Sequence, residues 1–158
     1  MARPPLTIAL TWDGALRFAA APNGVPLVID GKSEAGPSPV QALALALTGC
    51  MAVDVVDILQ KGRYTLRSAS ADFTGLRAPE PPSRFTAVTL HFRVAGDVPD
   101  HAVERAIALS RDKYCSVWHS LRQDIVFDTS FEVTPCRAAA TSGRASSGST
   151  GCAAWRSC

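Results

Sequence analysis

The chain has few cysteines outside its C-terminal tail and no recognisable export signal. Only Cys50 and Cys115 lie within residues 1–134, which is too few for the disulfide framework of a small secreted domain. The N-terminal stretch Met-Ala-Arg-Pro-Pro has no apolar core of a signal peptide. The uncharged run 42–53 is twelve residues long, too short for a membrane span. We therefore expect a cytoplasmic protein with no membrane contact.

Motifs of several other classes of protein are also missing. There is no glycine-rich phosphate loop, no Ser–His–Asp signature and no second ligand pair with metal spacing, so neither a cofactor nor a metal is predicted. Residues 1–134 carry 13 basic and 14 acidic side chains. This near-neutral body has no basic stripe, and nucleic-acid binding is not expected.

The composition is that of one globular domain followed by a tail. The chain has 158 residues, of which 47% are hydrophobic and 19% charged, enough to bury a core. From residue 135 the composition shifts to Ala, Ser, Gly and Thr without periodicity, and three arginines appear with no acid. We predict a domain over 1–134 and a disordered tail over 135–158.

A long apolar helix is predicted over residues 39–61. Pro39 suits a first helical position, Ser38 can cap it, and Gly62 stands just past the end. The helix is apolar nearly all round, which indicates a helix wrapped by a sheet or by a partner subunit.

Strands and shorter helices surround this helix in the sequence. Alternating patterns and turn signals predict the fold class α+β in the order βββ-α-ββ-αα-β, without an internal repeat. The expected strands cover residues 6–12, 16–20, 26–30, 64–74, 84–94 and 125–133, and the expected short helices lie at about 100–110 and 117–121.

The two cysteines of the body differ in setting. Cys50 lies in the apolar helix, where a cysteine commonly serves as a small hydrophobe. Cys115 lies where one helix ends and another begins; free N–H groups there, with Arg111 and Lys113 nearby in sequence, favour a thiolate. If the two thiols meet, they form a peroxidatic and resolving pair. Spacing does not show that they meet, so two buried structural cysteines remain the alternative.

Other polar groups have weaker interpretations. Cys115 and His119 are four residues apart, which suits a Cys–His nucleophile or half a metal site, and equally a histidine on a helix surface. The spacing of Asp54, Asp57 and Lys61 allows i,i+3 and i,i+4 contacts, which would stabilise the C-terminal end of the helix.

Two stretches together resemble the OsmC/Ohr family. The first is Gly36-Pro-Ser-Pro, then an apolar run, then Leu-Thr-Gly-Cys50-x-x-x-Asp54-Val-Val-Asp-Ile-Leu. The second is Ala108-Leu-Ser-Arg-Asp-Lys-Tyr-Cys115-Ser-Val. The resemblance covers about residues 6–134. It implies an OsmC-like intertwined homodimer, with sheets wrapped around central buried helices and two active sites at the subunit interface.

The resemblance also implies the roles of the thiols. Cys50 would be the peroxidatic cysteine that attacks an organic or fatty-acid hydroperoxide, and Cys115 the resolving cysteine; a small-molecule or protein dithiol would then reduce the pair. The sequence neighbours of Cys115 favour it as the more activated thiol, whereas the family pattern assigns the attack to Cys50.

Two positions depart from the family pattern or are not fixed by it. Peroxidases of the family have a glutamate near the helix start that orients an arginine onto the reactive thiolate, and here that position is Gln41. Our candidate for the arginine is Arg17 on the second strand. The alternative is that Arg17 simply faces solvent and has no role at the thiolate. Two functions therefore remain: a hydroperoxide reductase, or a non-catalytic protein that binds an apolar small molecule in the dimer cleft.

Overall fold

A computed structural model describes residues 4–135 of the chain; the tail predicted to be disordered lies, apart from Pro135, outside the described residues. The order βββ-α-ββ-αα-β is confirmed, with two additional helical turns, one after β2 and one between α2 and α3. The elements are β1 Thr11–Trp12, β2 Arg17–Ala20, the short turn η1 Pro22–Gly24, β3 Leu27–Asp30, α1 Pro39–Lys61, β4 Thr65–Arg77, β5 Phe85–Asp97, α2 Asp100–Leu109, the π-helical turn η2 Ser110–Tyr114, α3 Ser116–His119 and β6 Val126–Pro135.

The strands form two separate sheets. β1, β2 and β3 make an antiparallel meander, as predicted, while β4, β5 and β6 make a second three-stranded sheet. Within the second sheet β5 is antiparallel to β4 and parallel to β6. The parallel pair is possible because the segment from α2 to α3 crosses over between its two strands.

Helix α1 begins and ends where the sequence predicts. Ser38 accepts a hydrogen bond from the Gln41 N–H, and the Gln41 side chain in turn accepts one from the Ser38 N–H, so the two residues form a capping box. Pro39 occupies the first turn, and Lys61 is the last helical residue before Gly62.

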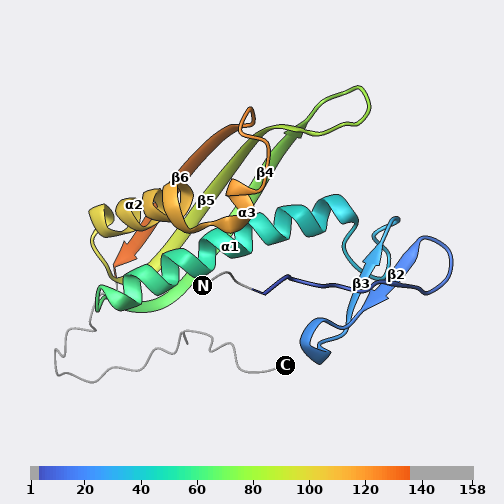
Figure 1. The fold of residues 1–158 in the computed structure, drawn as a ribbon. Coiled ribbons are helices and arrows are strands. Elements are labelled where there is room, and N and C mark those ends of the chain that lie inside the picture. Colours follow the sequence, from blue (N-terminus) through green and yellow to red (C-terminus); the bar gives the residue numbers. More distant parts are fainter. Residues whose placement is uncertain (1–3, 136–158) are drawn as a thin grey trace, which may run out of the picture.

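Only one stripe of α1 is buried within the chain. Leu47, Met51, Val55 and Leu59 recur every four residues, and each is at most 1% exposed. On other faces of the helix Leu45 and Val53 stay exposed, as does Leu43 at the N-terminal end of the stripe itself. By length and composition alone α1 could cross a membrane, which the short uncharged run did not indicate. In the structure it packs along the second sheet (Figure 1).

The core lies between α1, α2 and the β4–β6 sheet. The inward residues of β5 alternate as predicted, and α2 contributes the apolar face that its spacing indicates. The buried residues that line this core are Val88, Leu90, Phe92, Val94, Val103, Ala106, Ile107, Cys115 and Trp118.

The N-terminal sheet stands apart from this core. Figure 1 shows β2 and β3 beyond the end of α1 at which the helix begins, away from β4–β6. The segment that leads into it and the sheet itself expose large apolar side chains: Leu6, Ile8, Leu10, Trp12, Leu16, Phe18, Val25 and Leu27. A surface of this kind typically marks an interface.

Candidate functional site

Helix α1 and the turn after α2 bring the two body cysteines together. Cys50 lies in the middle of α1 and is partly exposed, while Cys115 lies between η2 and α3 and is buried. Although they are 65 residues apart in the sequence, their sulfur atoms lie within 4.8 Å of each other. The thiols therefore form one pair with one accessible and one enclosed member.

Cys115 caps the short helix α3 with its sulfur. The Trp118 N–H donates a hydrogen bond of 3.4 Å to Cys115 Sγ. This bond favours the thiolate, but burial has the larger effect, and the neighbouring Cys50 acts in the same direction as burial. Together they raise the pKa of the Cys115 thiol to about 11.

The interpretation that its sequence neighbours and a helix start activate Cys115 is therefore wrong. Its two basic sequence neighbours are engaged elsewhere: Arg111 pairs with Asp112, and Lys113 lies over the ring of Tyr114. An N–H group at a helix start cannot compensate for the loss of water around a buried sulfur.

A carboxylate that the sequence assigned to helix termination is the third member of the group. An oxygen of Asp54 lies within 4.8 Å of both sulfur atoms, and Asp54 Oδ2 accepts a 2.8 Å hydrogen bond from Ser110 Oγ. Lys61 pairs with Asp57, as predicted. Asp54 instead faces the thiols, because it follows Cys50 by one helical turn.

Ser110 was missed as a site residue, although the sequence carried a signal for it. It follows α2 directly, in line with the apolar face that the sequence predicts there, and its side chain is fully buried. A buried hydroxyl needs a hydrogen-bond partner, and here the partner is Asp54.

Among the described residues, one group has donor atoms close enough together to share a metal ion: Cys50, Asp54 and Cys115. Two thiolates and a carboxylate would suit Zn²⁺. Two of its three members are the cysteines of the thiol pair. His119 is exposed on α3 and is not part of it.

Within one chain Arg17 does not join the thiols. It is exposed on β2, opposite Asp30 of β3 in the register of the N-terminal sheet. In residues 4–135 of one chain, no arginine donates a hydrogen bond to either sulfur.

Gln41 also lies away from the thiols, in the first turn of α1. Its Oε1 accepts hydrogen bonds from the Ser38 N–H at 2.8 Å and from Ser33 Oγ at 2.9 Å. The side chain thus fixes the start of α1 to the loop after β3. Arg17 and Gln41 are both found toward the N-terminal sheet, whereas the two cysteines lie where α1 meets η2 and α3.

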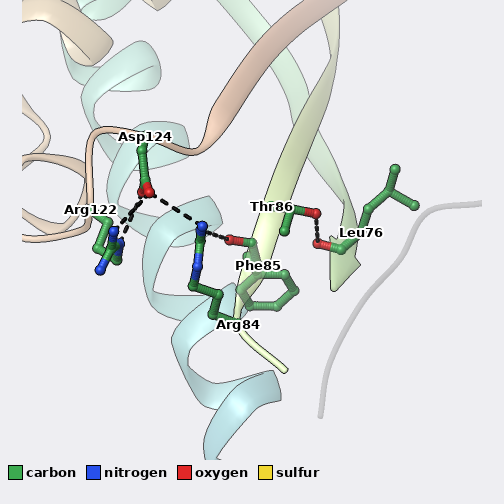
Figure 2. Close-up of polar contacts among 6 residues, drawn as sticks. All are labelled: Leu76, Arg84, Phe85, Thr86, Arg122 and Asp124. Carbon is green, nitrogen blue, oxygen red and sulfur yellow. Dashed lines mark hydrogen bonds and ion pairs between the residues drawn. The ribbon is translucent and has the colours of Figure 1, made fainter. Parts of the chain in front are cut away.

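An apolar cavity of about 230 Å³ lies beside the first half of α1. Its apolar wall includes Leu43, Leu47, Phe73, Phe85, Val88, Leu121 and Ile125, and Arg77, Arg84 and Arg122 also border it. Figure 2 shows Arg84 and Arg122 directed at the same carboxylate, that of Asp124. The cavity can accept an apolar group, with guanidinium groups at its border.

Comparisons with known proteins agree with this architecture. Residues 30–130 match the family described as OsmC-like protein. Protein YhfA of Escherichia coli (strain K12) is 41% identical over 125 residues, which cover 77% of this chain and 93% of YhfA.

Solved structures have the same fold. A hypothetical protein from Aquifex aeolicus VF5 superimposes with a TM-score of 0.79 at 24% identity, over 85% of this chain and 100% of the other. An organic hydroperoxide resistance protein OsmC from Legionella pneumophila gives a TM-score of 0.62 at 16% identity, over 83% and 100%. At these identities the likeness establishes the fold alone.

Proposed function

The chain belongs to the OsmC-like protein family, and from that premise we propose that it is a thiol-dependent peroxidase that reduces organic hydroperoxides. One observation carries the proposal: Cys50 and Cys115 come together from distant parts of the chain, one partly exposed and one buried. Paired thiols of this kind, one reachable by substrate and one beside it, suit a two-step oxidation.

The chemistry assigns a separate step to each thiol. The Cys50 thiolate attacks the O–O bond of the hydroperoxide, takes one oxygen as sulfenic acid and releases an alcohol after protonation. Cys115 then attacks the sulfenic sulfur, forming the disulfide and releasing water. A small-molecule or protein dithiol returns the pair to the reduced state by thiol–disulfide exchange.

We further propose that the working form is a homodimer. The exposed apolar surface of the N-terminal sheet and of α1 supports this, since Leu45 and Val53 are both more than half exposed in one chain. A partner that covered this surface could bring its own Arg17 toward Cys50. Such a dimer would use α1 as its core rather than as a membrane span, in keeping with a cytoplasmic role in the oxidative-stress response.

A peroxide-consumption assay with a dithiol reductant tests the proposed activity. Steady loss of cumene hydroperoxide, abolished by Cys50→Ser, is the expected result. Hydrogen peroxide should react more slowly, because an apolar site gains about 25 cal/mol per Å² of buried apolar substrate.

The second candidate function is binding of an apolar small molecule without turnover. The apolar cavity beside Leu43 and Leu47 favours it, as does the neutral Gln41 in place of a glutamate. Displacement of an apolar fluorescent probe, with no peroxide loss and both thiols still free, would support this candidate over the first.

A further inference from the structure

The carboxylate of Asp54 is the member of the thiol group that the two-cysteine chemistry leaves without a role. It follows Cys50 by one turn of α1, and one of its oxygens is within 4.8 Å of the sulfur atoms of both Cys50 and Cys115. A carboxylate in a partly buried site loses part of its hydration, and hydrogen bonds must replace what it loses.

Ser110 holds this carboxylate and the second thiol at the same time. Its buried hydroxyl donates to Asp54 Oδ2 at 2.8 Å, and its carbonyl oxygen accepts the Cys115 N–H at 2.8 Å. Ser110 begins the π-helical turn η2, and insertions of this type recur at functional sites. Ser110 occupies Asp54 Oδ2, which leaves Oδ1 as the carboxylate oxygen that a second donor can reach.

The other charged groups nearby are engaged away from the thiols. On α1, Asp57 pairs with Lys61. On η2, Arg111 pairs with Asp112, and Lys113 lies over a tyrosine ring. Among the described residues of one chain, Asp54 is therefore the acid or base grouped with the two thiols.

The second step of the proposed reaction needs such a base. Only a thiolate attacks a sulfenic sulfur at a useful rate. Burial raises the pKa of the Cys115 thiol to about 11 in the reduced pair, so little of that thiolate is present at neutral pH. The buried thiol therefore needs a nearby group that takes its proton as the sulfur attacks.

Building on the proposed peroxidase function, we propose that Asp54 is the catalytic proton acceptor for Cys115, positioned by Ser110. The Cys115 S–H bond breaks and its proton passes to the Asp54 carboxylate, while the sulfur attacks Cys50 Sγ. The S–O bond of the sulfenic acid breaks, and the oxygen leaves with its own hydrogen and the proton from Asp54, as water. Cys50 is reduced and Cys115 oxidised, so this step requires no outside electron donor.

Single-turnover kinetics separate this step from the first. The full-length chain is used with its tail cysteines, Cys136, Cys152 and Cys158, replaced by serine, and it is mixed with one equivalent of cumene hydroperoxide. Trapping with dimedone reports the sulfenic acid on Cys50, and peptide mass spectrometry reports the Cys50–Cys115 disulfide. Asp54→Asn removes the base with little change in size, and Asp54→Glu restores it.

We expect Asp54→Asn to slow disulfide formation by about 10²-fold or more, as for loss of a general base, while sulfenic acid accumulates. The rate in this variant should rise roughly tenfold per pH unit, because it then depends on free thiolate; the parent rate should vary much less. Asp54→Glu should recover part of the rate. Ser110→Ala, which leaves the carboxylate in place, should fall between the parent and Asp54→Asn.

Two failures are distinguishable. If the parent protein consumes no peroxide and loses no thiols, the peroxidase proposal fails and the Asp54 role fails with it. If the parent reacts but Asp54→Asn forms the disulfide at the parent rate and with the parent pH profile, only the Asp54 proposal is overturned. Should Asp54→Asn not fold, as judged by circular dichroism, an unchanged rate and pH profile in Ser110→Ala would overturn it instead.

Discussion

Ser110 and Asp54 are joined by a hydrogen bond of 2.8 Å, although they lie 56 residues apart in the chain. The bond connects α1 to the turn that carries Cys115, whose N–H is itself bound to the Ser110 carbonyl. One buried residue thus links the packing of two helical segments to the geometry of the thiol pair.

Replacing Ser110 with alanine should therefore lower stability as well as slow the reaction. The substitution leaves a partly buried carboxylate without its donor, and we expect a loss of about 1–3 kcal/mol in the free energy of unfolding. Urea titration followed by circular dichroism measures this. Ser68→Ala, on the exposed surface of β4, serves as the control, and an equal effect of the two substitutions would contradict the prediction.

The stability of the fold should depend on pH through the carboxyl group of Asp30. The Lys32 N–H lowers the pKa of this carboxyl most, and the Ala35 N–H adds to the effect, so its pKa lies below the ordinary 3.8. A group with a lowered folded-state pKa contributes stability above its unfolded-state pKa and loses that contribution as pH falls through the folded value.

Asp30→Asn should accordingly melt several degrees below the parent protein at pH 7. The gap between the two melting temperatures should narrow below about pH 4, where the parent carboxyl also becomes neutral. Asp128→Asn, an exposed change on β6, is the matched control. A gap that stays constant from pH 7 to pH 3 would show that the charge of Asp30 is not what holds its loop.

Gln41→Glu should raise both stability and turnover. A glutamate can keep the capping box with Ser38, and its negative charge at the start of α1 is favourable by about 0.3–1 kcal/mol. If a dimer brings the start of α1 near Cys50, the charge should also help to hold an arginine on the thiolate. Thermal melting and peroxide assays separate the effects, and higher stability with unchanged turnover would limit Gln41 to capping.

The purified chain should be a dimer under reducing conditions. Light scattering at micromolar concentration should give twice the chain mass of 16.7 kDa, because a monomer would leave the apolar side of α1 and the N-terminal sheet in water. Val53→Asp, on the exposed side of α1, should weaken association, whereas Ser70→Asp on β4 should not. A parent protein that elutes and scatters as a monomer would exclude the dimer.

The elements of the fold could be predicted because their signals are local. Proline, serine and glycine mark the ends of α1, and alternation reveals the inward residues of β5. The separation of the N-terminal sheet from the core could not be predicted, because it depends on which strands pair and not on what each strand contains. The parallel pairing of β5 with β6 has the same origin.

The site was predictable only in part, because it too depends on contacts between residues that are distant in sequence. The resemblance pointed to Cys50 and Cys115, and the structure brings them together. The activation of Cys115 was misjudged from its sequence neighbours. Arg111 and Lys113 contact other residues, and burial raises the pKa of the thiol. Asp54 stood in the family pattern, but it was interpreted only as a helix-ending residue because its partner, Ser110, is distant in sequence.

The central claim is that Cys50 and Cys115 act as one redox pair, and thiol counting tests it most directly. The full-length chain without its tail cysteines is treated with one equivalent of cumene hydroperoxide, and free thiols are then titrated. We predict the loss of two thiols per chain and one intramolecular Cys50–Cys115 disulfide, and Cys115→Ser should still consume one equivalent as Cys50 becomes sulfenic acid. Two thiols that remain free in excess hydroperoxide, with no peroxide lost, would contradict it.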